Sequence, residues 1–82
     1  MIDQLARMVK ERDEAFTDFV LTGNKTKVET YCRKYGVRIP KNDKVFAAGI
    51  YKAVQEIRGI PKDIKAMAAD KCRQMGFKPE MD

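Results

Sequence analysis

The sequence predicts an all-α protein, a small bundle of about four helices with a long N-terminal helix. Apolar residues recur at spacings of three and four in four stretches of the 82-residue chain, which is the period of helices that bury one face. Glycine ends helices by taking a left-handed conformation, and proline cannot continue them. Three stretches are followed by such a corner: Gly36, Val37 and Pro40; Gly59, Ile60 and Pro61; Gly76, Phe77 and Pro79. No stretch alternates apolar and polar residues for long enough to predict a strand.

The first helix is expected at residues 2–22. At about 1.5 Å per residue it would be roughly 30 Å long, which is long for so small a chain. Residues 10–14 are polar on every face, so we expect this section to stand in solvent or to meet a partner. A two-stranded coiled coil would use the apolar seam, although Arg12 interrupts it; the alternative is one amphipathic helix on the protein's own core. The candidate self-association residues are Ile2, Leu5, Val9, Phe16 and Phe19.

The second helix is expected to run from residue 26 to a stop at Gly36. Gly23 and Asn24 are expected to end the first helix, and Thr26 with Glu29 has the pattern of a capping box. Four apolar residues then share one face of the second helix: Val28, Tyr31, Cys32 and Tyr35.

The third helix is expected at about residues 43–58, with Asn42 or Asp43 as its N-cap. Its apolar stripe is Phe46, Ile50, Ala53, Val54 and Ile57. Glycine weakens a helix interior, so the small residues 47–49 predict that another helix approaches closely there.

The fourth helix is expected to have Pro61 in its first turn. Its inward residues are Ile64, Met67, Ala68, Cys72 and Met75. Phe77 is expected to cap it, and residues 78–82 to form a loose tail. We therefore expect one helical domain over residues 1–82.

The composition argues against catalysis. The chain has no His and no Ser, so the usual general base and the commonest nucleophile are both missing. We expect no enzyme, no cofactor and no small-molecule substrate. Cys32 and Cys72 do not make a recognisable zinc site without histidine, and both are expected to be inert buried thiols. The carboxylates of residues 11–18 are expected to form a solvated helix face.

Neither a membrane span nor a signal peptide is expected. No run approaches the roughly 20 apolar residues that a span needs. Asp3, Arg7 and Lys10 lie among the first apolar positions, unlike the start of a signal peptide. We therefore expect a cytoplasmic protein.

The basic charge is concentrated in one segment. The whole chain carries 17 basic and 12 acidic residues, a net charge of +5, and residues 23–42 carry six basic residues and only Glu29 as an acid. If these cations converge on one face, they suit phosphates, an acidic protein, or solvent alone. The candidate basic patch is Lys25, Lys27, Arg33, Lys34, Arg38 and Lys41.

A helix-turn-helix element could use the same segment. Residues 26–37 resemble the first helix and turn of that motif, with Gly36 and Val37 where it needs a glycine and a small apolar residue. The linker at residues 38–42 is longer than the tight turn of the motif. An element at residues 26–58 is therefore the basis of the nucleic-acid alternative.

Two segments resemble short uncharacterised proteins carried by phages and prophages of Gram-positive bacteria. They are YCRKYGVRIPKNDKVFAAGIYKA (31–53) and IPKDIKAMAADKCRQMGFKP (60–79), and the resemblance covers about two thirds of the chain, residues 27–79. It implies a bacterial cytoplasm and a mobile element, where small basic helical proteins often act as accessory binders. It implies no functional residues.

These observations predict a non-catalytic binding or adaptor protein that acts through protein–protein contacts. A homodimer through the first helix is one form of this prediction. The alternative is a nucleic-acid-binding protein that uses the helix-turn-helix-like element and the basic patch.

Overall fold

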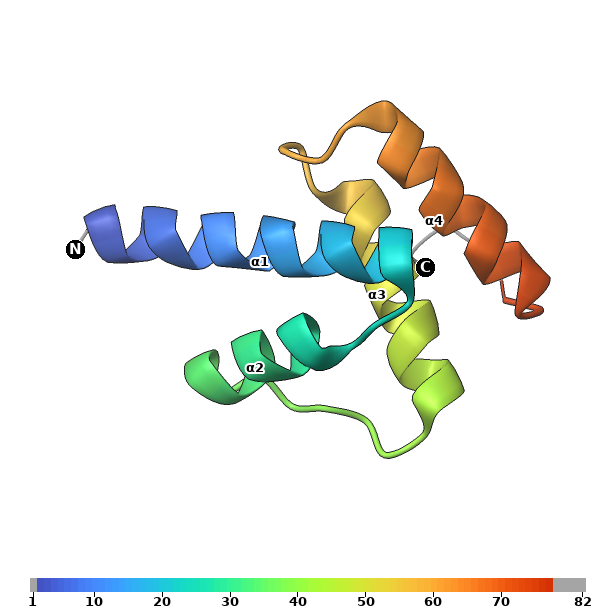
Figure 1. Ribbon diagram of the computed structural model, residues 1–82, viewed down its shortest axis with the longest axis horizontal. Helices are drawn as coiled ribbons and strands as arrows, with labels where there is room; N and C mark the ends of the chain where they lie inside the picture. Colours follow the sequence, from blue (N-terminus) through green and yellow to red (C-terminus); the bar gives the residue numbers. More distant parts are fainter. Residues whose placement is uncertain (1, 78–82) are drawn as a thin grey trace. The chain divides into compact units, whose positions relative to one another are not determined.

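The computed structural model describes the backbone of residues 2–77 and the side chains from residue 3 onward. Four helices make up the described chain: α1 (Ile2–Thr22), α2 (Thr26–Tyr35), α3 (Asp43–Glu56) and α4 (Lys62–Gln74) (Figure 1). Within residues 2–77 there is no strand. The prediction of an all-α protein with a long first helix is confirmed.

The chain divides into two compact units, Met1–Ile39 and Pro40–Asp82. In the first unit α1 packs on α2, and in the second unit α3 packs on α4. Each unit is therefore a pair of consecutive helices joined by a short connection. The single domain over residues 1–82 stays a prediction, and the predicted tail at residues 78–82 lies outside the described residues.

The core of the first unit lies along the C-terminal half of α1. An edge-to-face aromatic pair joins the two helices, with the ring centres of Phe16 and Tyr31 5.9 Å apart. Such pairs add to the stability that burial gives. The buried residues are Ala15, Phe19 and Val20 from α1 and Val28, Tyr31 and Cys32 from α2.

The connection between α1 and α2 differs from the predicted capping box. Gly23 ends α1 with φ 75°, and its N–H donates to the Phe19 carbonyl oxygen at 2.8 Å. Lys25, not Thr26, is the N-cap residue of α2, and its side chain makes no capping bond. The Asn24 side chain instead accepts from the Thr26 N–H at 2.9 Å. The capping-box prediction was wrong because asparagine bonds to the backbone two residues ahead and takes this donor first.

The glycine corners are confirmed at two of three places. Gly36 (φ 68°) and Gly76 (φ 86°) are left-handed, and the N–H groups of Val37 and Phe77 return to the Cys32 and Cys72 carbonyls at 2.8 and 3.1 Å. These bonds satisfy carbonyl groups that the end of a helix leaves unpaired.

At Gly59 the predicted corner was wrong. α3 ends at Glu56, two residues before the predicted end, because Ile57 is extended (φ −89°, ψ 118°). Ile57 and Ile60 are both buried. The chain therefore leaves the helix early to bury two isoleucines, and Gly59 does not take a positive φ.

The core of the second unit contains most of the predicted stripe. Phe46, Ile50 and Val54 are buried as predicted, together with Tyr51, whereas Ala53 is half-buried. From α4, the buried residues are Ile64, Ala68 and Cys72.

Two further predictions about the second unit had different outcomes. Asn42 is the N-cap of α3, accepting from the N–H groups of Lys44 and Val45 at 2.9 and 3.1 Å. The inward placement of Met67 was wrong, since its side chain is 36% exposed, and Met75 is half-buried. α4 packs on a single helix of its unit, so its buried face is only one residue wide at every turn.

Within residues 2–77, no helix is both long and apolar enough to cross a membrane.

Candidate functional site

The first half of α1 extends beyond the end of α2 (Figure 1). α1 has 21 residues and α2 has 10, and the last residue of α2, Tyr35, bonds to Glu11 of α1. The part of α1 before Glu11 therefore lies past the end of its partner helix. We call residues 3–10 of α1 the overhang; it is roughly 12 Å long.

Apolar side chains of the overhang are exposed. Leu5 is 64% exposed and Val9, one turn later, is 38% exposed. A space of about 400 Å³ is lined by Gln4, Leu5 and Met8 of the overhang and by Tyr35 of α2. We call this space at the end of α2 the hollow.

The predicted self-association seam is thus divided between solvent and core. Leu5 and Val9 are exposed, Phe16 is half-buried, and Phe19 is only 5% exposed. The side chain of Ile2 lies outside the described residues. Only the N-terminal part of the seam is accessible to another molecule, because the C-terminal part already belongs to the protein's own core.

Two ion pairs join α1 to α2 on either side of the core. Lys34 Nζ donates to both carboxylate oxygens of Glu11, at 2.8 and 3.1 Å. Lys27 Nζ lies 3.6 Å from Asp18 Oδ1. Both acids and both lysines are seven residues apart, so the pairs form two rungs between antiparallel helices.

The same carboxylate also binds Tyr35. Its hydroxyl donates to Glu11 Oε2 at 2.9 Å, the Lys34 ammonium lies 5.4 Å from the centre of the Tyr35 ring, and the Tyr31 ring centre lies 5.1 Å away. Residues 10–14 were expected to meet solvent or a partner, and Glu11 meets α2 of the same chain.

These contacts change the acidity of the paired groups. The hydrogen bond from Lys34, and then that from Tyr35, lowers the pKa of Glu11 below its ordinary value. The Glu11 carboxylate raises the pKa of Lys34 in return. Both shifts favour the charged forms, so the rung is fully charged near neutral pH.

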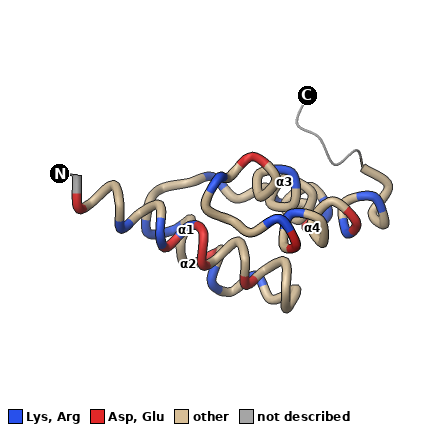
Figure 2. The backbone as a smooth tube through the Cα atoms, turned by 90° about the horizontal axis from the view of Figure 1, so that it is seen from above, with Lys and Arg blue, Asp and Glu red and all other residues tan. Residues whose placement is uncertain are grey.

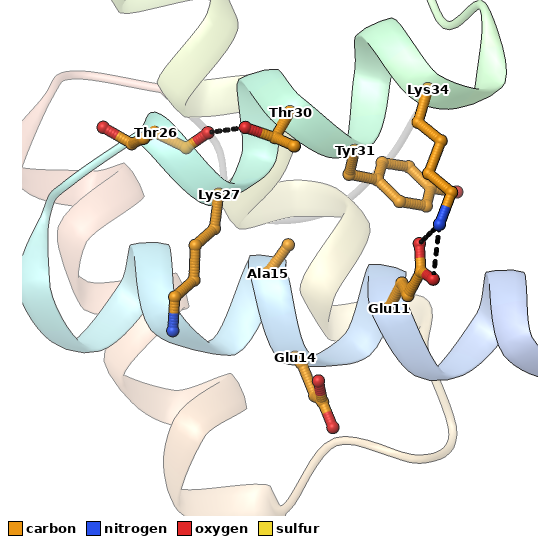
Figure 3. A pocket seen from close by; sticks show the side chains of 8 residues that line it. All are labelled: Glu11, Glu14, Ala15, Thr26, Lys27, Thr30, Tyr31 and Lys34. Carbon is orange, nitrogen blue, oxygen red and sulfur yellow. Dashed lines mark hydrogen bonds and ion pairs between the residues drawn. The ribbon is translucent and has the colours of Figure 1, made fainter.

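Between the two rungs, small side chains leave an open groove of about 310 Å³ (Figure 3). Lys27 and Lys34 extend from α2 towards α1, whereas Glu14 points away from α2 (Figure 3). The groove therefore offers no cation that is not already paired across it. It is lined by Glu11, Glu14, Ala15, Thr26, Lys27, Thr30, Tyr31 and Lys34.

The six residues of the candidate basic patch differ in ion pairing, in exposure and in the unit to which they belong. Lys27 and Lys34 are paired with acids of α1. Arg33 and Arg38 are exposed, and in the described part of the chain neither has a carboxylate within ion-pair distance. Lys25 is half-buried, and Lys41 is exposed but belongs to the second unit. Basic and acidic residues are interspersed along both units (Figure 2).

The predicted helix-turn-helix element spans both units. Its first helix, α2, lies in the first unit, and its second helix, α3, lies in the second. The helices that pack within a unit are α1 with α2 and α3 with α4.

The two thiols are buried, as predicted. Burial, with a smaller effect of Glu29, raises the pKa of Cys32, which disfavours the reactive thiolate. Among the described residues, no three carboxylate or thiol side chains gather closely enough to hold a metal ion.

From the sequence we did not predict that Glu11, Lys34 and Tyr35 meet: Lys34 was placed in the basic patch, Tyr35 on the apolar face of the second helix and Glu11 on a solvated face. A usable signal was present, because acids at residues 11 and 18 and lysines at residues 27 and 34 have the same seven-residue spacing. On two helices joined by a short connection, that spacing predicts antiparallel rungs.

No protein-family model matches the chain, and no curated protein or solved structure is significantly similar to it.

Proposed function

We propose that this chain is a non-catalytic binding protein that acts through protein–protein contacts, and that the overhang of α1 is its contact surface. The observation that supports this most directly is Leu5, which is 64% exposed and lines the hollow with Met8 and Tyr35. Exposed apolar patches on small proteins commonly mark surfaces that another molecule covers.

The proposed occupant of this surface is the overhang of a second copy. The hollow continues the face of α1 that α2 covers from Glu11 onward, so a helix lying there follows α2 end to end. Two overhangs placed antiparallel each supply apolar side chains and each cover those of the other. This is the self-complementary geometry of a two-fold symmetric dimer.

The dimer is expected to be weak. The overhang is roughly 12 Å long, and its contact area falls well below the ~800 Å² per partner of a standard stable interface. The association is therefore expected to depend on concentration, with a dimer dissociation constant of about 10 µM to 1 mM.

Sedimentation equilibrium over a concentration series tests the proposal. Leu5→Glu places a charge on the apolar surface and is expected to raise the dimer dissociation constant at least about tenfold. Ala6→Glu is the matched control, because Ala6 is also exposed on the overhang but does not line the hollow, and the added charge is the same. It is expected to leave the constant within about twofold.

Other results would point to a different occupant or surface. A wild-type protein that stays monomeric at millimolar concentration overturns the second copy as occupant. Equal effects of Leu5→Glu and Ala6→Glu overturn the face of the overhang that lines the hollow as the contact surface.

Nucleic-acid binding is the second candidate function, and the exposed guanidinium groups of Arg33 and Arg38 favour it. They belong to the segment that carries most of the net positive charge. The loss of Lys27 and Lys34 to pairing within the first unit weighs against it.

A further inference from the structure

We propose that Glu11 is a positioning residue for the hollow, acting through Tyr35. This inference rests on the proposed function of the overhang. Glu11 does not line the hollow, yet its charged side chain is expected to affect how tightly this apolar surface packs against a second copy.

Tyr35 is the last residue of α2, where the helix has no following turn to hold a side chain. A helical side chain leans over the turn before it, so the direction of this ring is set by its contacts with other side chains. Three such contacts are present: the hydroxyl bond to Glu11 Oε2 at 2.9 Å, the Lys34 ammonium 5.4 Å from the ring centre, and the Tyr31 ring 5.1 Å away.

Glu11 controls two of these three contacts. One of its oxygens accepts from both the Tyr35 hydroxyl and Lys34 Nζ, and the other accepts from Lys34 Nζ alone. A charge-assisted bond is stronger and shorter than a neutral one. The carboxylate therefore fixes both the ring and the ammonium that lies over it.

The same ring forms one wall of the hollow, facing Gln4, Leu5 and Met8. If the ring is released, the hollow loses a defined wall although every apolar atom remains. An incoming Leu5 of a second copy would then have to order the ring at an entropic cost.

The experiment compares Glu11→Gln with Glu14→Gln. Both changes replace a carboxylate by an amide on α1, but Glu14 is exposed and points away from α2 (Figure 3). Glu11→Gln is expected to raise the dimer dissociation constant roughly three- to tenfold, and Glu14→Gln to change it by less than about twofold. Tyr35→Phe keeps the ring without its hydroxyl and is expected to act like Glu11→Gln. The double variant is expected to add little more, because both changes act on the same bond: Glu11→Gln removes the charge of the acceptor and Tyr35→Phe removes the donor.

A second readout follows the ring in the monomer. At concentrations below the dimer dissociation constant, the NMR signals of the Tyr35 ring are expected to shift in Glu11→Gln. The signal of the Met8 methyl group is expected to shift in both Glu11→Gln and Tyr35→Phe, and both sets of signals should stay in place in Glu14→Gln. This readout decides the inference even if the wild type never dimerises, a result that would remove only the proposed function. Far-UV circular dichroism measures whether each variant is folded. If Glu11→Gln is unfolded, Tyr35→Phe tests the same bond in its place.

Glu11→Gln behaving like Glu14→Gln in both readouts overturns the inference. So would a Tyr35→Phe variant with wild-type NMR signals at Met8 and a wild-type dissociation constant.

Discussion

Gly49 lies in the interior of α3, is exposed, and has backbone angles that do not require glycine. A Cβ atom built there would meet none of the described atoms within 4 Å. The expected close approach of another helix at this residue is therefore wrong. Glycine here only adds backbone freedom to the unfolded chain.

Gly49→Ala is expected to stabilise the protein by about 1 kcal/mol. The midpoint of thermal unfolding, followed by circular dichroism at 222 nm, should rise by roughly 4–8 °C. Gly36→Ala is the control, because Gly36 has φ 68° and alanine in that conformation is strained by about 1–2 kcal/mol. A midpoint that is unchanged or lower in Gly49→Ala would contradict this prediction.

At the scale of elements, the rung between Glu11 and Lys34 makes the packing of α1 on α2 depend on pH. The pKa of Glu11 lies below its ordinary 4.5, so its stabilising effect is present above about pH 4.5 and is lost as the pH falls through the folded value. The pKa of Lys34 lies above its ordinary 10.5, so its contribution is present below that pH and is lost as the pH rises through the folded value.

The difference in thermal stability between the wild type and Glu11→Gln should therefore be largest and flat from about pH 5 to pH 10. It should decline below about pH 4.5, as the pH falls through the lowered pKa of Glu11. Because the groups are exposed, salt should also reduce the difference. Melting curves at several pH values and two salt concentrations measure this, and a difference that stayed constant as the pH fell from about 5 into the strongly acidic range would contradict an electrostatic origin.

Element boundaries followed from the sequence where one local signal acts alone. α1 ends before Gly23 and α2 ends before Gly36, as predicted, because a left-handed glycine closes both helices. α2 begins at Thr26, as predicted, but its capping was predicted wrongly because two signals compete: Asn24 and Thr26 can both bond to the first N–H groups. The end of α3 was misassigned because the burial of Ile57 and Ile60 outweighs the signal of Gly59.

The candidate site was predictable only in part, for a similar reason. The apolar seam of α1 is visible in the sequence, but which half is covered depends on how far α2 reaches along it. That length, from residue 26 to Gly36, was available from the sequence. The pairing of Glu11 with Lys34 was also open to prediction from the seven-residue spacing of acids and lysines. The bond from the Tyr35 hydroxyl to Glu11 was not, because it depends on where the ring lies at the end of α2.

At the scale of the whole molecule, the net charge of +5 is not equivalent to five available cations. Lys27 and Lys34 are paired within the first unit, whereas Arg33 and Arg38 are exposed. Substitution of the two lysines therefore tests whether the basic segment stabilises the first unit. Substitution of the two arginines tests whether it binds nucleic acid.

Fluorescence anisotropy with random duplex and single-stranded DNA is expected to show only weak binding that disappears at about 0.15 M salt. Arg33→Ala with Arg38→Ala should remove this binding without changing stability, whereas Lys27→Ala with Lys34→Ala should mainly lower stability. Tight binding that survives physiological salt and depends on Arg33 and Arg38 would favour the nucleic-acid function over the protein-contact function.

Each unit contains one cysteine, Cys32 in the first and Cys72 in the second, and both are buried. We therefore expect neither thiol to react with a water-soluble reagent such as a nitrobenzoate disulfide until its own unit opens. In two single-cysteine variants, each with the other cysteine replaced by alanine, the rate of thiol labelling would measure how often one unit opens. Their labelling rates would show whether the two helix pairs open together as one cooperative body or separately.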